Sequence, residues 1–399
     1  MSKILIIGAG WEQEALIIEA KRQGHFVIAT HPKFNTTGFK HSDVHFVKDS
    51  SDIDSHLTIA KTFEVEGVLS DNCDFSLYTA SVVSNALNLN SVSIQSGFYS
   101  NNKFEQRNIC AKANILQPKY VKLQTLEDLK FAVEYLNYPL ILKPVDSRGT
   151  FGVTIVKSKE NLEVAFFEAL ANSASHTVIC EKFIEGVLVT VDGFGFNNGH
   201  HSLAVASRSF ESGVKPVTKE IVYPAKFSDE LNSLLMSNHN NVCQALGYNQ
   251  GHTHGEYIVT KENEIYLVEC TNRGGGVYTS STIVPYITEL NLNEILINQS
   301  LGIDEFKIEG EGVNLMINSV ILTFLDFEFG KVIKSINLSE LNNLDYVLNF
   351  RSIFKKNDMV ELIENCASRH SMLVIKGSNS IETFKNLKSF KNLLNIKYY

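Results

Sequence analysis

The first hundred residues alternate short apolar runs with segments of helical spacing. Residues 3–7 form a continuous apolar run of the kind found in buried parallel strands, and after a turn residues 14–22 continue at helical spacing. Two further apolar runs, 26–29 and 67–70, predict parallel strands with helices between them. Strands that alternate with helices indicate a small doubly wound α/β domain over residues 1–102.

The middle of the chain, residues 103–302, predicts helices and short strands that belong to two sheets. Helical spacing covers 103–113 and 126–136, and Thr125 is the expected N-cap of the second helix, because its hydroxyl can accept a free backbone N–H. The expected strands are 119–121, 140–144, 153–156, 177–180, 189–194, 255–259 and 264–267. Residues 115–185 read as a smaller subdomain within this region.

From residue 303 onwards the pattern changes to alternating segments such as 313–322 and 372–377, separated by loops rich in lysine and asparagine. This alternation predicts a small α+β domain over residues 303–399. Its residues carry no obvious chemistry, so a lid, an oligomer surface such as a homodimer contact, and structural packing all stay open.

The composition describes an ordinary globular protein that does not act mainly on nucleic acid. The chain has 399 residues, of which 44% are hydrophobic and 20% charged, enough for two or three well-filled domains. A formal net charge of -8 disfavours nucleic acid as the main partner, and no apolar run reaches membrane-spanning length. The six cysteines show no C-x-x-C spacing, so we expect reduced thiols and a cytoplasmic location.

A glycine turn follows the first strand and invites comparison with dinucleotide-binding turns. The turn, residues 8–13, places Gln13 where that fingerprint requires its third glycine. The second strand ends in Thr30 and His31 instead of the acid that would bind a ribose. These differences favour a structural or substrate-facing turn over a nicotinamide site.

Two acids near the end of the middle region are the first candidates for metal chemistry. Glu269 follows an apolar run and precedes Arg273 and three glycines, and Glu256 lies thirteen residues earlier at the edge of another alternating run. A hairpin of two adjacent strands would bring these carboxylates side by side, a spacing suited to shared Mg²⁺ ions. The alternative is that both acids are solvated strand ends.

Other polar candidates each have an ordinary structural reading. Lys143 lies inside a strand, and the following loop, residues 147–152, could fold over an anion or be a plain glycine hairpin; it is not a Walker loop. Lys103 and Arg107 lie one helical turn apart, and by default they are solvated surface charges. Residues 252–254 carry two alternating histidines, which we interpret as half-buried histidines and not as zinc ligands.

Taken in order, these segments resemble the ATP-grasp superfamily, and in particular its carboxylate–amine ligases of the L-amino-acid ligase type. The resemblance covers nearly the whole chain. It rests on residues 8–10, Lys103, residues 138–144, 147–153, 181–186, 253–256 and 269–276, with a softer likeness at 375–380. It implies a pre-ATP-grasp α/β domain, a two-part ATP-grasp domain and a small C-terminal α+β domain. The smaller part of the ATP-grasp domain, residues 115–185, would be a lid subdomain over the nucleotide.

The resemblance also implies where ATP lies. Lys103 and Lys143 would contact its phosphates, and the glycine loop would fold over them through Ser147, Arg148, Gly149 and Thr150. The adenine would be held by the segment formed by Glu181, Lys182, Phe183 and Ile184. Leu188 stands where many members have a ribose-binding acid, so ribose binding would either be weaker or pass to Asp192.

The metal and catalytic residues follow from the same resemblance. Glu256 and Glu269 would bind Mg²⁺, with Mn²⁺ as a further option. Many members have asparagine two residues after the second acid, whereas this chain has Thr271 there and Asn272 next, so either could complete the site. Arg273, with Lys143, would be catalytic and would neutralise the phosphoryl group or the substrate carboxylate.

The implied activity is the ATP-dependent joining of a carboxylate to an amine through an acyl phosphate, with release of ADP and phosphate. Two alternatives remain: a carboxylase or kinase that uses bicarbonate or another oxygen nucleophile, and an ATP-binding module without catalysis, suggested by Leu188 and Thr271. The chain has no biotin-attachment sequence. We expect a small-molecule acid and a small-molecule amine as substrates, but the sequence does not identify either molecule. The residues expected to contact them are Arg273, Tyr278, residues 252–254, the Arg208 region and residues 71–74.

Overall fold

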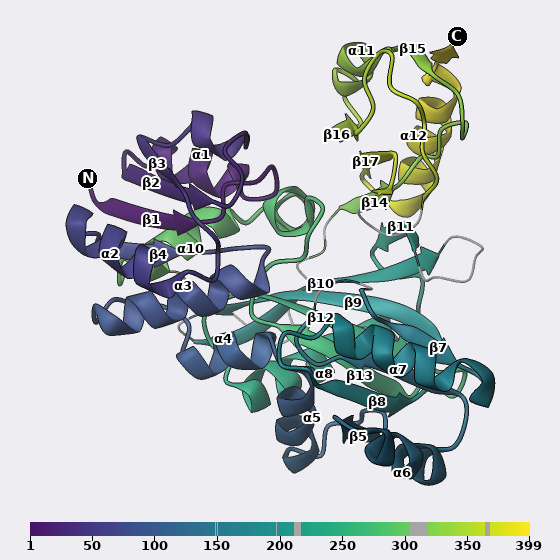
Figure 1. The fold of residues 1–399 in the computed structure, drawn as a ribbon. Helices are drawn as coiled ribbons and strands as arrows, with labels where there is room; N and C mark the ends of the chain where they lie inside the picture. Colours follow the sequence, from purple (N-terminus) through teal and green to yellow (C-terminus); the bar gives the residue numbers. More distant parts are fainter. Residues whose placement is uncertain are drawn as a thin grey trace.

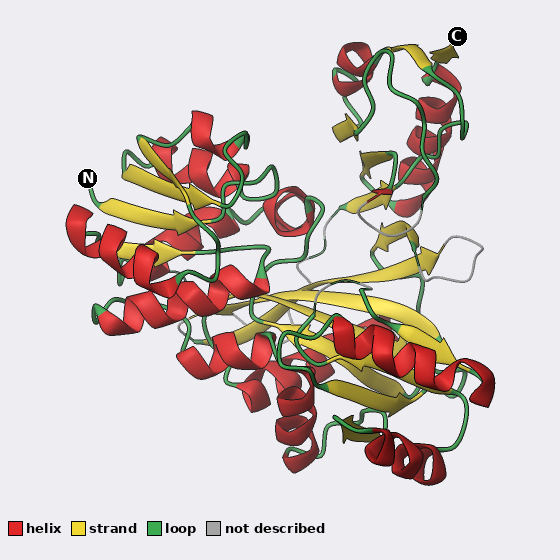
Figure 2. Cartoon of the chain, viewed as in Figure 1, coloured by secondary structure: helices red, strands yellow, loops and turns green. Residues whose placement is uncertain are grey.

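The computed structural model describes the chain from Met1 to Tyr399 except residues 148, 150, 197, 211–216, 304–305, 307–315, 317 and 364–367. Figure 1 shows an N-terminal domain in purple, a C-terminal domain in yellow, and a central sheet that connects them. Figure 2 shows that helices surround the long strands of this central sheet. None of the described helices is long and apolar enough to cross a membrane.

The N-terminal domain is built on a parallel sheet with strand order β3-β2-β1-β4. Its elements are β1 (Lys3–Ile7), α1 (Glu14–Arg22), β2 (Phe26–His31), β3 (Val44–Val47), α2 (Ile53–Phe63), β4 (Gly67–Leu69), α3 (Asp74–Ala86) and α4 (Ile94–Ser100). Apolar side chains of α1 pack on one face of the sheet, and those of α2 and α3 pack on the other. The predicted doubly wound domain is therefore confirmed.

A second, antiparallel sheet has the order β5-β8-β6-β7 and forms the lid subdomain. Its elements are β5 (Tyr120–Leu123), α6 (Leu126–Leu136), β6 (Leu140–Pro144), β7 (Thr154–Val156), α7 (Leu162–Ala171) and β8 (Val178–Lys182). Thr125 caps α6 and forms a capping box with Asp128, as the sequence predicts for this N-cap. Both helices cover one face of the sheet, so its other face is left for Lys143 and Glu181.

The large central sheet has the order β13-β12-β9-β10-β11-β14-β17-β16. Its first part comprises β9 (Val187–Phe196), β10 (Gly199–Phe210), β11 (Thr218–Tyr223), β12 (Gly251–Val259) and β13 (Ile265–Thr271), with α5 (Lys103–Lys112) and α8 (Asp229–Leu246) packed against it. The sheet continues across residue 303, because Glu220 of β11 pairs with Thr323 of β14. Two further helices, α9 (Val284–Thr288) and α10 (Leu292–Ser300), follow β13, and α10 packs on the N-terminal domain through Ile297.

The C-terminal part extends this sheet and adds a small β-pair. It contains β14 (Ser319–Thr323), β15 (Ile333–Ile336), α11 (Leu338–Asn342), β16 (Val347–Ser352), β17 (Ser371–Gly377), α12 (Ser380–Leu393) and β18 (Ile396–Tyr398). The predicted strand 313–322 lies partly outside the described residues, whereas the strand predicted at 372–377 is present as β17. In the described part of the chain the five cysteines are free thiols, and Cys366 lies outside that part.

Candidate functional site

Two carboxylates face each other across neighbouring strands. Glu256 of β12 is the direct cross-strand partner of Glu269 of β13, as the sequence predicts. Each is paired with a cation: Arg208 Nη1 lies 2.8 Å from Glu256 Oε1, and Lys103 Nζ lies 3.0 Å from Glu269 Oε1. Like charges at opposed positions repel. The two cations offset this repulsion, so these acids are partly buried, ion-paired groups and not solvated strand ends.

Glu256 is held in its ionised form. Burial by itself would raise the pKa of this carboxyl, but the charges of Arg208 and the neighbouring His254 outweigh burial and hold its pKa well below the usual range. The carboxylate is therefore available at neutral pH. Ionised carboxylates are oxygen ligands well suited to Mg²⁺ and Mn²⁺.

A buried triad joins the lid subdomain to the central sheet. Glu181 of β8 accepts from Arg107 Nε at 2.8 Å and lies 2.8 Å from Lys143 Nζ of β6. Arg107 also donates to the carbonyl of Val268 in β13 at 2.7 Å. Burial disfavours ionised Glu181, but the two cations more than offset it and lower the pKa of the carboxyl.

The default expectation that Lys103 and Arg107 are solvated is wrong, because both side chains are buried. Helical spacing shows that the two share a face, but it does not show what that face packs against. Lys103 Nζ also donates to the carbonyl of Ser147 at 2.8 Å, so this lysine connects the glycine loop with Glu269.

The described part of the glycine loop has the backbone of a tight turn. Gly149 and Gly152 have φ of +59° and +70°, where a side chain would be strained. Arg148 and Thr150 lie outside the described residues. The loop's predicted contact with phosphate therefore stays a prediction.

The segment predicted to hold adenine follows β8. Lys182 Nζ donates to the carbonyls of Asn137 and Tyr138 at 3.1 and 2.8 Å, and the N–H of Phe183 donates to the carbonyl of Pro139 at 3.1 Å. These bonds fix the segment, which continues into Ile184, against the turn before β6. The adenine contact itself stays a prediction.

Asp192 takes part in a network inside the central sheet. Its Oδ1 lies 2.7 Å from His254 Nδ1, and Tyr223 donates its hydroxyl to Oδ2 at 2.7 Å. The other ring nitrogen of His254 lies 3.9 Å from Glu256 Oε1. Neighbouring side chains therefore engage both oxygens of Asp192, and this network orients His254 towards Glu256. The predicted contact of Asp192 with a ribose stays a prediction.

Thr271 and Asn272, at the end of β13, make different contacts. The hydroxyl of Thr271 donates to the carbonyl of His254 at 3.4 Å. Asn272 donates its amide Nδ2 to the carbonyls of Gln250 and His252 at 2.8 and 2.9 Å. Its Oδ1 is buried and accepts no hydrogen bond from the described residues. No hydrogen bond of the described residues places this oxygen at the carboxylate pair, so the carboxylates of Glu256 and Glu269 are the donors that fit Mg²⁺ or Mn²⁺ here.

Arg273 is held by the N-terminal domain. Its Nε and Nη2 bind the two carboxylate oxygens of Asp74 at 2.9 and 3.2 Å. Asp71 accepts from the N–H of Gly274 at 2.7 Å, and Asn72 donates to the carbonyl of Gly275 at 2.8 Å. Residues 71–74, expected to read substrate, therefore anchor the glycine segment after β13.

The backbone just beyond this segment is strained. Val277 and Tyr278 have φ of +55° and +65°, and a five-residue π-helix, η3 (Thr279–Ile283), follows. A β-branched residue at positive φ is unusual, and both strain and π-helical turns concentrate at functional sites. Glu12 stabilises the turn by accepting the N–H of Val277 at 2.6 Å.

Sequence reasoning missed the role of Glu12, although it placed this residue in a turn that could face substrate. Its neighbour Gln13 fills that turn, since Gln13 Oε1 accepts the N–H of Gly10 at 3.0 Å and Gln13 Nε2 donates to the carbonyl of Asp71 at 3.3 Å. The glycine turn is therefore packed by protein atoms, which supports its structural reading.

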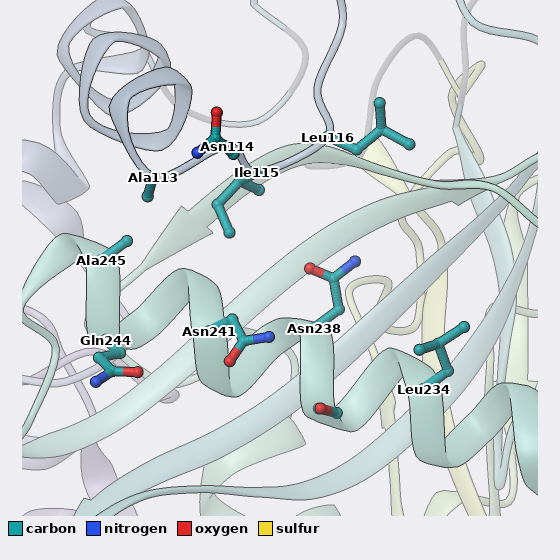
Figure 3. A pocket seen from close by; sticks show the side chains of 10 residues that line it. Ala113, Asn114, Ile115, Leu116, Leu234, Asn238, Asn241, Gln244 and Ala245 are labelled. Atoms are coloured by element: carbon teal, nitrogen blue, oxygen red, sulfur yellow. The ribbon is translucent and has the colours of Figure 1, made fainter.

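A separate cavity of about 600 Å³ lies between α8 and residues 113–116 (Figure 3). Amide side chains such as Asn238 and Asn241 line it. Helix α8 packs on Val191 and Tyr257, whose side chains alternate along their strands with those of Asp192 and Glu256. The cavity is therefore on the other face of the sheet from the carboxylate pair and is not part of the candidate site.

Comparison with known proteins agrees with this geometry. Residues 136–281 match a family model described as an ATP-grasp domain. The chain is 29% identical over 199 residues to a formate-dependent phosphoribosylglycinamide formyltransferase of Prochlorococcus marinus, covering 47% of this chain and 50% of the relative. It is 28% identical over 155 residues to a D-alanine–D-alanine ligase of Trichlorobacter lovleyi, covering 38% and 48%.

A solved structure resembles the whole molecule. The L-amino acid ligase of Bacillus licheniformis superimposes with a TM-score of 0.82 at 19% identity, covering 100% of this chain and 99% of that one. At this identity the likeness shows the fold alone. The chain spans about half the length of the curated relatives above.

Proposed function

Because this chain carries an ATP-grasp domain within an ATP-grasp fold that extends over its whole length, we propose that it is an ATP-dependent carboxylate–amine ligase. The observation that carries the proposal is the opposed pair Glu256 and Glu269, with Lys103 and Arg208 on its two carboxylates. Lys143 and Arg273 are the further cations of the proposed site, and Glu181 and Asp74 hold them. This charge pattern suits a metal-bound polyphosphate and a second anionic reactant.

Each part of the site then has a physical role. Glu256 and Glu269, with Asn272 or Thr271, would hold Mg²⁺ or Mn²⁺, which when bound neutralises phosphate charge. Lys103 and Lys143 would bind phosphate oxygens, and Arg273 would stabilise the charge that develops on the transferred group. The segment 181–184 would position adenine.

The proposed reaction has two steps. The carboxylate of the first substrate attacks the γ-phosphoryl group, which breaks the bond to ADP and forms an acyl phosphate. The amine of the second substrate then attacks the acyl carbon, loses a proton and expels phosphate, which leaves an amide. Closure of loop 147–152 would exclude water, because water would otherwise hydrolyse the acyl phosphate.

The test is a phosphate-release screen of paired acids and amines with mass detection of the product. Glu269→Gln removes a metal-binding charge and should lower turnover at least about 100-fold with unchanged circular dichroism. Glu264→Gln, an exposed acid just before β13, is the matched control and should keep its turnover. Full activity of the Glu269 variant would refute the metal assignment, and ADP release that needs bicarbonate but no amine would point to a carboxylase.

A further inference from the structure

Three side chains from three parts of the chain meet next to the strained turn. Trp11 comes from the turn after β1, Tyr278 from the segment after β13, and Arg351 from β16 in the C-terminal part. The rings of Trp11 and Tyr278 lie 5.0 Å apart, and the guanidinium of Arg351 lies 4.9 Å from the centre of the Trp11 ring. Burial raises the pKa of the Tyr278 phenol, and the nearby charge of Arg351 partly offsets this rise.

Arg351 differs from other arginines in its lack of a carboxylate partner. Arg107, Arg208 and Arg273 are each ion-paired, with Glu181, Glu256 and Asp74 respectively. Within the described part of the chain, no carboxylate lies within 4.0 Å of the Arg351 guanidinium. The face of the Trp11 ring orients this guanidinium but does not neutralise its charge.

The surroundings of Arg351 suit a small ligand. All three side chains are partly buried, so each keeps some surface open to solvent. Tyr278 belongs to the same turn as Arg273, five residues further along, and this turn is fixed by Glu12. A guanidinium can form two parallel hydrogen bonds to a planar or tetrahedral anion, and the two rings can cover carbon atoms next to it.

Building on the ligase function, we propose that Arg351 selects substrates that carry a second anionic group besides the reacting carboxylate. The substrate's carbon chain lies along Trp11 and Tyr278, and its second carboxylate or phosphate binds Arg351. The substrate class is therefore an acidic amino acid or a phosphorylated analogue. A neutral amide isostere leaves the guanidinium without an anion and is disfavoured.

The test compares L-aspartate, L-glutamate and O-phospho-L-serine with L-asparagine and L-glutamine. Binding is measured by calorimetry without ATP, and kcat and KM are measured separately by phosphate release. Wild-type protein should prefer an anionic compound over its amide by about tenfold or more, and Arg351→Gln should erase this preference without changing the KM for ATP. The comparison of aspartate and glutamate with phosphoserine shows whether Arg351 prefers a carboxylate or a phosphate.

Two variants separate specificity from folding. Arg22→Gln removes an exposed arginine on α1 and should keep the preference. Arg351→Lys keeps the charge without the planar fork and should retain part of it. The inference is overturned if Arg351→Gln retains the preference, or if wild-type protein binds anions and amides equally or binds neither. If the binding preference holds but no pair releases phosphate, only the ligase proposal fails.

Discussion

Replacing Glu181 by glutamine should weaken the junction between the lid subdomain and the central sheet. The glutamine side chain keeps the shape of glutamate but loses its charge, which leaves Arg107 and Lys143 buried without a carboxylate. These three groups come from α5, β6 and β8, and Arg107 also binds β13. The substitution therefore acts on the region where four elements meet.

The size of the effect follows from the geometry. Two charge pairs with 2.8 Å between nitrogen and oxygen correspond to about 6 kcal/mol of attraction each at an effective dielectric constant of about 20. Desolvation offsets much of this attraction in the intact triad. When one partner is removed from a buried pair, the desolvation cost of the remaining charge is no longer compensated. Such a removal typically destabilises the folded protein by about 3–5 kcal/mol.

Hydrogen exchange with mass spectrometry measures this loss locally, which suits a chain of several domains better than a global midpoint does. Peptides that contain β6 and β8 should exchange more than about 100-fold faster in Glu181→Gln, since about 1.4 kcal/mol corresponds to a factor of ten. Glu19→Gln breaks a pair at 2.7 Å with Arg22, whose guanidinium is exposed to solvent, and should accelerate exchange of α1 only slightly. Equal effects of the two variants would refute the argument for a buried triad.

Two further predictions concern the anchored turn and the far face of the sheet. In Gly274→Ala the new Cβ would lie 2.3 Å from Ser280 Cβ, so the turn must shift and turnover should fall by about 10- to 100-fold, whereas Ser281→Ala should be neutral in the same phosphate-release assay. Burial lowers the pKa of His200 to about 4 and that of His239 well below its usual value, so below about pH 6.5 the unfolded chain binds protons that the folded chain does not. Stability should therefore fall as the pH drops from about 6.5 towards 4, by at most about 1.4 kcal/mol per pH unit for each histidine. The free energy of unfolding, measured with urea at several pH values, should depend less steeply on pH in His239→Gln than in the wild-type protein. The exposed-site control His41→Gln should keep the wild-type pH dependence, and equal pH dependence in the two variants would contradict this account.

Local sequence signals account for the parts of the fold that were predicted well. Helix α6 has the expected length because Thr125 supplies an N-cap and the apolar positions repeat at helical spacing. The pairing of Glu256 with Glu269 was also predictable, because a short hairpin between two alternating strands leaves few registers. Both features depend on residues that lie close together in the sequence.

The remaining contacts of the candidate site join residues far apart in the sequence. Arg107 reaches Glu181 and Val268 from a helix whose spacing gives no sign of burial. The N–H of Val277 is bound by Glu12, which lies 265 positions earlier. No periodicity or spacing rule encodes such pairs, because they depend on how complete domains pack together.

The strained turn after β13 is stabilised by contacts with the N-terminal domain. Positive φ at Val277 and Tyr278 costs of the order of 1–3 kcal/mol per residue. Hydrogen bonds to charged groups contribute about 1.5–3 kcal/mol each, and Glu12, Asp71 and Asp74 provide several of them to the turn. The strain and its compensation are thus of similar size, and the compensation comes from the N-terminal domain. The position of Arg273 therefore depends on how this domain is docked, and the proposed role of this arginine depends on the same contacts.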